Sequence, residues 1–128
     1  VFYALAGQKC QETQKSAGFV RMEDVLNNMK QNYAAELTLE SISEVFHLSP
    51  NYLATQFKKF TGRTVNQQIT SIRIERAKQL LTDSTLSMHQ IAHAVGYQSG
   101  EYFFRVFKKV THLTPGEWRE QTNPGKLS

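Results

Sequence analysis

The sequence of 128 residues has few of the features that mark secreted or membrane proteins. Its single cysteine, Cys10, cannot form an internal disulfide, which fits a reducing compartment. No apolar run approaches the roughly 18 residues that a membrane helix needs. The opening VFYALAG is short and lacks the basic flank of a secretory signal. We therefore expect a cytoplasmic protein with no membrane partner.

The sequence also lacks the patterns that carry catalysis, since it has no glycine-rich phosphate loop and no nucleophile elbow. Its one approach to a metal motif is HQIAH, in which His89 and His93 lie four residues apart and face one side of a helix. The related zinc motif carries a glutamate that acts as the base, and Gln90 stands there instead. Two partly exposed histidines on a helix are the alternative. We expect no enzyme, no metal and no cofactor.

The composition is that of a globular protein with a basic surplus. Hydrophobic residues make up 40% of the chain, and 15 Lys and Arg exceed 11 Asp and Glu, for a net charge of +4. A polyanionic partner is compatible with this charge but is not established by it. The sequence does not begin with Met, and residues 1–20 show no sustained periodicity. We expect residues 1–20 to be the remnant of a linker from a missing upstream sensor, effector or receiver domain.

Helical periodicity and capping residues predict an all-α fold. Ser or Thr residues stand where N-caps are expected, at Thr38, Ser49, Ser87 and Thr114. The predicted segments are a first helix over 22–33, a helix-turn-helix over 38–60, a linker helix over 64–82, a second helix-turn-helix over 87–110, a final helix over 115–121 and a tail over 123–128.

One unit of the sequence occurs twice. The triplet Phe-Lys-Lys at 57–59 returns at 107–109, and the preceding helix and turn repeat with it. In a helix-turn-helix the second helix lies in the major groove, so one of its faces packs on the core and the other stays free. We expect the packing faces to be Leu53, Phe57 and Phe60, and Phe103, Phe107 and Val110. A linker helix of roughly 30 Å could hold two such helices near the 34 Å repeat of B-DNA.

The residues also resemble a known family over about 22–120. The segments LTLESISEVFHLSPNYLATQFKKFTG, RIERAKQLL and MHQIAHAVGYQSGEYFFRVFKKVTHLTPGEWR occur in the order typical of the AraC/XylS family of bacterial transcription regulators. The resemblance implies a seven-helix double helix-turn-helix domain over 21–122 that binds double-stranded promoter DNA and contacts RNA polymerase. The base-reading positions that it implies are Asn51, Ala54, Thr55, Gly100, Glu101, Phe104 and Arg105. The expected phosphate contacts are Ser49, Lys58, Lys59, Arg63, Ser99, Lys108 and Lys109.

Most of the base-reading positions have a second interpretation in which the side chain reads no base. Arg105 could bond guanine in bidentate fashion, or pair with a phosphate or with Glu101 one turn earlier. Asn51 could read adenine or help to cap the start of its helix, and Thr55 could contact a base, a phosphate or only water. Glu101 fits cytosine or the positive end of the helix dipole. Phe104 could touch a thymine methyl group or pack against its own subdomain.

Two departures from the family pattern concern turns, because His47 and His112 stand where glycine is expected. Histidine tolerates a positive φ better than most residues, so we expect both turns to survive.

The alternative to a DNA-binding domain is a helical protein-interaction module with a basic face. Since this chain carries both reading helices, we expect it to be monomeric, while the full-length protein could dimerise through what is absent.

Overall fold

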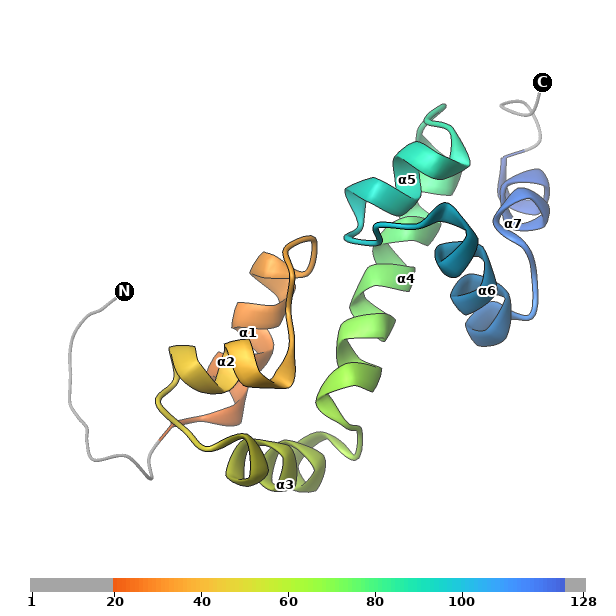
Figure 1. Cartoon of the computed structure of the whole chain (residues 1–128). Helices are drawn as coiled ribbons and strands as arrows, with labels where there is room; N and C mark the ends of the chain where they lie inside the picture. Colours follow the sequence, from red (N-terminus) through yellow and green to blue (C-terminus); the bar gives the residue numbers. More distant parts are fainter. Residues whose placement is uncertain (1–19, 124–128) are drawn as a thin grey trace. The chain divides into compact units, whose positions relative to one another are not determined.

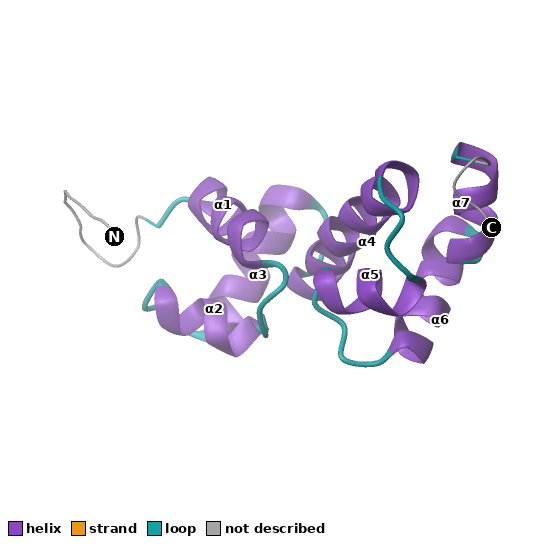
Figure 2. Ribbon diagram, turned by 90° about the horizontal axis from the view of Figure 1, so that it is seen from above, coloured by secondary structure: helices purple, strands orange, loops and turns teal. Residues whose placement is uncertain are grey.

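The structure, a computed structural model, describes residues 20–123. Over these residues the chain forms seven α-helices (Figure 1) and no strand (Figure 2). The helices are α1 (Met22–Asn32), α2 (Leu39–Val45), α3 (Pro50–Thr61), α4 (Val65–Asp83), α5 (Met88–Ala94), α6 (Gly100–Thr111) and α7 (Pro115–Thr122). The all-α, seven-helix prediction is confirmed. Residues 1–19 of the expected linker and residues 124–128 of the expected tail lie outside the described residues.

The described chain divides into two compact units. Unit 1 comprises residues 20–28 and 38–65, which include α2 and α3, and unit 2 comprises residues 29–37 and 66–123, which include α5, α6 and α7. Within unit 1, α2 packs on α3, and within unit 2, α5 packs on α6. Each unit therefore contains one complete helix-turn-helix.

Unit 2 is built around a core of aliphatic and aromatic side chains. Phe103 and Phe107 of α6 are fully buried, and their ring centroids lie 5.7 Å apart. The ring of Trp118 of α7 meets that of Phe107 edge to face with centroids 6.0 Å apart, so Trp118 packs against this core. Burial of a Phe side chain contributes about 2 to 3 kcal/mol, so these rings fix α6 against its unit. The other buried members are Ile74, Ala77, Leu81, Ile91, Ala92, Val95 and Tyr97.

In unit 1, α3 repeats the burial pattern of α6. Leu53 and Phe57 are fully buried, as Phe103 and Phe107 are in α6, and Ile42 of α2 is buried with them. Each of the eleven positions from 51 to 61 has the same burial class as the position fifty residues later. The repeat in the sequence is therefore a repeat in packing.

Three predicted packing positions are wrong. Phe60 and Val110, at the end of the predicted packing faces of α3 and α6, are 52% and 46% exposed. Val45, which the helical spacing of the sequence places on one face with Leu39 and Ile42, is 58% exposed. Phe60 and Val110 lie in the last turns of α3 and α6, after the buried Phe57 and Phe107, so each packing face ends before its helix does.

The predicted caps and turns are confirmed. The side-chain oxygen of each expected N-cap accepts a main-chain N–H at the start of its helix. The two helix-ending turns match, since Gly62 has φ 79° and His112 has φ 68°. The turns inside the two helix-turn-helix motifs also match, with His47 at φ 57° and Gly96 at φ 107°. Histidine therefore adopts the left-handed conformation that glycine adopts in the other copy.

Candidate nucleic-acid interface

The first turns of α3 and α6 are fixed in the same way. Ser49 Oγ accepts the main-chain N–H of Tyr52 at 3.1 Å, and Ser99 Oγ accepts that of Tyr102 at 3.2 Å. Both serines are exposed, and their hydroxyl hydrogens remain available to an external acceptor. The two serines therefore cap their helices, and their predicted phosphate contacts are compatible with that role.

The outward face of α3 is polar and accessible. Asn51, Thr55 and Lys58 are exposed, and Ala54 is half-buried between them. Because Ser49 is the N-cap, the amide of Asn51 is not used for capping. The face thus offers an amide, a hydroxyl and an ammonium group, with a small residue between them. Such a face fits the major groove, where the bases present both donors and acceptors.

The outward face of α6 has different chemistry. Glu101, Arg105 and Lys108 are exposed, and no ion pair joins Arg105 to Glu101 in the part of the chain that the structure describes. The guanidinium of Arg105 is therefore not held by the carboxylate that sequence reasoning offered as its alternative partner. We call α3 and α6, the second helices of the two helix-turn-helix motifs, the recognition helices. They have the same burial pattern but present different outward side chains, as two readers of an asymmetric site would.

Two of the predicted base-reading residues, Gly100 and Phe104, also have a packing role in unit 2. The rings of Phe104 and His89 meet edge to face with their centroids 5.4 Å apart, and the ring centroids of Phe104 and Phe103 are 5.9 Å apart. A Cβ atom at Gly100 would lie 2.5 Å from His89 Cδ2. Gly100 thus leaves room for His89, which in turn supports Phe104.

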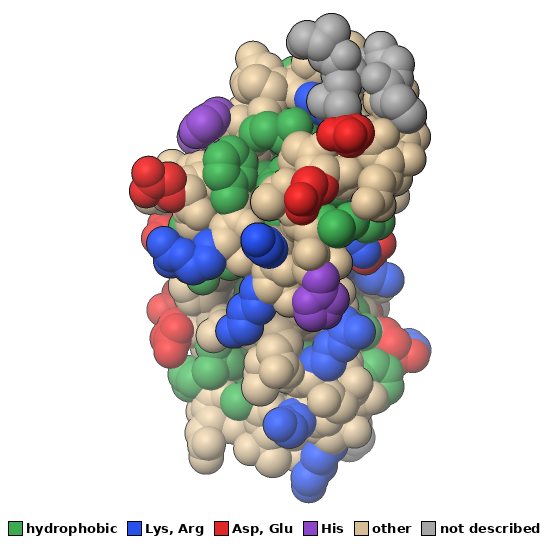
Figure 3. All heavy atoms as spheres, turned by 90° about the vertical axis from the view of Figure 1, so that its right-hand side faces the viewer, with side chains coloured by type: hydrophobic (Ala, Val, Ile, Leu, Met, Phe, Trp, Pro, Cys, Tyr) green, Lys and Arg blue, Asp and Glu red, His purple; other side chains and the backbone are tan. Residues whose placement is uncertain are grey.

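The predicted phosphate contacts lie at both ends of the recognition helices. Lys58, Lys59, Lys108 and Lys109 occupy the last turns of α3 and α6, where cations are favoured by the helix dipole, and all four are exposed. Arg63 follows the first of these helices and is also exposed. Figure 3 shows Lys and Arg side chains on a face where acidic and hydrophobic side chains also occur. On this face the basic side chains therefore do not form a uniform basic surface.

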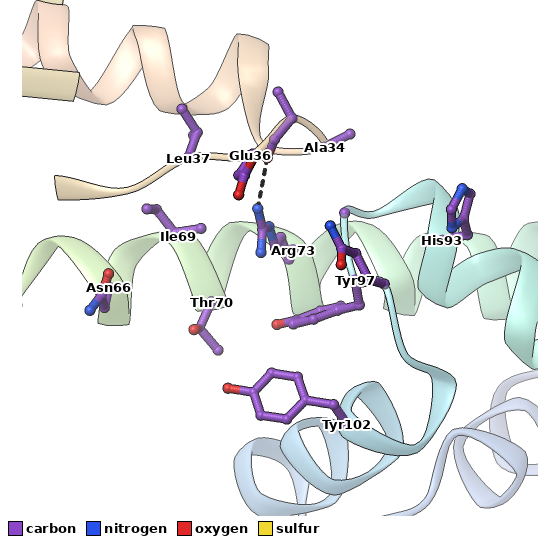
Figure 4. Close-up of a pocket in the computed structure, with 13 residues that line it drawn as sticks. Ala34, Glu36, Leu37, Asn66, Ile69, Thr70, Arg73, His93, Tyr97 and Tyr102 are labelled. Carbon is purple, nitrogen blue, oxygen red and sulfur yellow. Dashed lines mark hydrogen bonds between the residues drawn. The ribbon is translucent and has the colours of Figure 1, made fainter. Parts of the chain in front are cut away.

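Beside α6, unit 2 has a hollow of about 700 Å³. Arg73 of α4 donates to the main-chain oxygens of Tyr33 at 2.7 Å and Ala35 at 2.9 Å, and its guanidinium lies 5.3 Å from the ring centroid of Tyr97. Tyr97 in turn lies 5.7 Å from Tyr102 (Figure 4). Burial raises the pKa of the Tyr97 phenol, so this group stays protonated in neutral solution.

Sequence reasoning missed Tyr52 and Tyr102, which are 42% and 51% exposed at equivalent positions of the two recognition helices. Their repetition at an interval of fifty residues was a signal that could have found them. It also missed Arg119 of α7, which is buried and donates to the main-chain oxygens of Leu81 and Ser84 at 3.0 and 3.1 Å. The burial and hydrogen bonds of this arginine depend on residues distant in the sequence, so no local sequence pattern predicts them.

Among the described residues, neither a metal-binding cluster nor a membrane-spanning helix is found. In residues 20–123, no three His, Cys, Asp or Glu side chains gather as a metal site requires. His89, the first histidine of HQIAH, lies against Gly100 and Phe104. None of the described helices combines the length and the apolar character of a membrane span.

Known proteins are similar to this chain in fold and sequence. A family model described as "Helix-turn-helix domain" matches residues 42–121. The uncharacterized HTH-type transcriptional regulator YijO of Escherichia coli K12 is 35% identical over 117 residues, which are 91% of this chain and 41% of that protein. The bifunctional transcriptional activator/DNA repair enzyme AdaA of Bacillus subtilis is 30% identical over 90% of this chain and 55% of that protein. The chain thus spans about half, or less, of these relatives.

A solved structure matches the two units as well. The C-terminal domain of the two-component response regulator yesN from Fusobacterium nucleatum has a TM-score of 0.73 and 33% identity, and the match covers 77% of this chain and 98% of that one. The match to the family model includes both helix-turn-helix motifs and extends from α2 into α7. The chain belongs to the AraC family of helix-turn-helix transcription regulators, of which it is the DNA-binding domain.

Proposed function

We propose that this domain binds double-stranded promoter DNA sequence-specifically, with α3 and α6 in adjacent segments of the major groove. The observation that carries the proposal is the repeated helix-turn-helix, whose two recognition helices have the same burial pattern and different outward side chains. A reader of an asymmetric DNA site needs that divergence.

The lengths of the helices support a double-site reader. A major groove about 12 Å wide admits an α-helix, and α3 and α6 each offer about three turns. The 19 residues of α4, between the two motifs, correspond to a rod of about 28 Å. Successive major-groove segments on one side of B-DNA are about 34 Å apart, and bending of the DNA can absorb a difference of this size.

We propose that Arg105 of α6 reads a guanine. Its guanidinium can donate two hydrogen bonds to guanine O6 and N7, worth about 1 to 3 kcal/mol of discrimination. On α3, we propose that Asn51 reads adenine and that Thr55 and Ala54 contact a thymine methyl group or a neighbouring base edge. Glu101 lies in the first turn of α6, where the helix dipole favours its charge whether or not a cytosine amino group is bound.

The lysines supply affinity that is independent of base sequence. Lys59 and Lys109 lie at equivalent positions in the last turns of their helices and can reach phosphates on either side of the groove. If the domain neutralises about six phosphates, log K falls with log salt at a slope of roughly −5. Measured across a range of salt concentrations, that slope counts the phosphate contacts.

We propose wider roles for the whole protein from family membership. A promoter-binding regulator acts in the bacterial cytoplasm and contacts RNA polymerase. The relatives are longer than this chain, which supports an upstream sensor, effector or receiver domain joined through residues 1–20. This domain itself carries no enzymatic role in the proposal, although the relative AdaA is a DNA repair enzyme as well as an activator. We propose that the chain alone binds as a monomer, because it already contains two recognition helices.

A comparison of two substitutions tests the proposal. Arg105→Ala is expected to relax preference at one base pair of the preferred duplex, at a cost of about 1 to 3 kcal/mol there. Lys59→Ala is expected to weaken binding to all duplexes alike and to reduce the salt slope by about 1. Fluorescence anisotropy with a panel of single-base variants of the duplex measures both effects. Equal weakening of every duplex by both substitutions would refute a reading role for Arg105.

The alternative is a protein-interaction module that uses the basic groups to meet an acidic partner. Competition separates the two, because such a module would not distinguish a selected duplex from a scrambled duplex of the same length and charge. The different outward faces of α3 and α6 favour the DNA reader.

A further inference from the structure

We propose that Tyr102 donates a hydrogen bond from its phenol to a DNA backbone phosphate seated in the hollow of unit 2, with Tyr97 as the residue that positions it. The proposal rests on the proposed function and adds a contact that the sequence-based assignment of phosphate contacts does not contain. Its geometric basis is the row of Arg73, Tyr97 and Tyr102 at the edge of α6 (Figure 4).

The position of Tyr102 on the recognition helix points to DNA. Tyr102 is half-exposed in the first turn of α6, and Arg105 is three residues further on, so their side chains are neighbours on the helix surface. A phosphate bonded to Tyr102 would flank the base pair that Arg105 reads. Phosphate contacts of this kind fix the register of a reading helix without carrying sequence information.

The hollow is suited to an anionic oxygen. Figure 4 shows the hydroxyl groups of Tyr97 and Tyr102 pointing the same way, toward the side that Thr70 lines. The two phenols can donate hydrogen bonds, and the guanidinium of Arg73 adds positive charge nearby. Glu36 is the one acidic residue among those that line the hollow, and His93 is the one histidine. Donors and a cation outnumber the single carboxylate, which favours a phosphate ligand.

The row of side chains also holds Tyr102 in place. Arg73 is fixed by its hydrogen bonds to two main-chain oxygens, and it lies over Tyr97, which is only 7% exposed. Tyr97 then supports one side of the Tyr102 ring. Unit 1 lacks this row, because Leu48 occupies the position that corresponds to Tyr97. Tyr52, which corresponds to Tyr102, therefore serves as a matched control.

The test removes one hydroxyl group from the whole chain. Tyr102→Phe keeps the ring against Tyr97, and we expect it to weaken binding about tenfold on every duplex alike, because a hydrogen bond to a charged phosphate is lost. Tyr52→Phe is expected to change affinity less than threefold. Thermal unfolding of both variants, followed by circular dichroism, is expected to match the wild type, because each hydroxyl belongs to a half-exposed side chain.

Modified DNA identifies the ligand. A series of duplexes, each with one neutral methylphosphonate, is expected to contain one position at which wild type and Tyr102→Phe bind equally. The proposal is overturned if Tyr102→Phe binds the unmodified duplex within twofold of wild type, if Tyr52→Phe loses as much, or if the loss persists with every modified duplex. Failure of the proposed function would look different, since the wild type itself would then show no preference for one duplex over its scrambled copy.

Discussion

Replacement of Gly100 by Ala tests whether this residue of α6 serves packing or base reading. Ala is favoured over Gly in a helix by up to about 1 kcal/mol, so the substitution alone should stabilise the first turn. In the structure the added Cβ would lie 2.5 Å from His89 Cδ2 and 2.8 Å from His89 Nε2, well inside the 3.5 to 4.0 Å of normal contact. The imidazole must therefore rotate away.

That rotation removes the edge-to-face contact between His89 and Phe104, whose centroids lie 5.4 Å apart. Such ring pairs contribute about 0.5 to 1.5 kcal/mol. We therefore expect Gly100→Ala to be neutral or slightly destabilising in the wild type. In a His89→Ala background the same substitution should stabilise by up to about 1 kcal/mol, because the clash is gone. The expected coupling between the two substitutions is about 1 kcal/mol.

Urea unfolding of the four proteins in this cycle measures the coupling. Binding measurements on the same proteins separate the two roles of Gly100. If packing is its only role, Gly100→Ala leaves base preference unchanged when His89 is also Ala. Equal stabilisation by Gly100→Ala in both backgrounds would refute the packing argument, since the imidazole would then not compete with the Cβ.

Three further predictions concern stability and are measured by chemical denaturation. Arg119→Ala should lower the free energy of unfolding by about 3 kcal/mol, because two hydrogen bonds from a buried guanidinium to main-chain oxygens are lost; a loss below 1 kcal/mol would contradict this. Gly62→Ala should cost about 1 kcal/mol from its positive φ alone, whereas Gly96→Ala should cost more, because its Cβ would also lie 2.8 Å from a main-chain oxygen; equal costs would count against the clash. His112→Gly should stabilise the domain by up to about 1 kcal/mol, and a loss of stability would show that the left-handed histidine is unstrained.

The sequence predicted the helices and their caps well because their determinants are local. An N-cap such as Ser49 needs only its own hydroxyl and the next turn of the chain, and Pro50 beside it marks the helix start. The left-handed turns were predictable from the repeat, since glycine occupies the position of His112 in the other copy. The repeat made each half of the chain a guide to the other.

The burial of individual side chains and the contacts between distant segments were not predictable in the same way. The periodicity of α3 places Phe60 on the side of Leu53, yet Phe60 is 52% exposed, because burial depends on what packs over each turn and not on periodicity alone. Arg73 depends on a segment of chain about forty residues away, so its role as an anchor has no local signature. In the candidate site, four of the seven predicted base-reading residues are exposed, while Ala54, Gly100 and Phe104 are half-buried. The support of Phe104 by His89 depends on tertiary packing, which no local pattern shows.

The central claim is that one chain reads two neighbouring segments of DNA, and selection from a randomised duplex library tests it most directly. We would select at about 0.15 M salt, where long-range attraction between charges is partly screened. The account predicts an enriched motif with two parts about one helical turn apart, one for α3 and one for α6. A folded, helical protein that enriched no motif would contradict it and would leave only non-specific attraction or a protein partner.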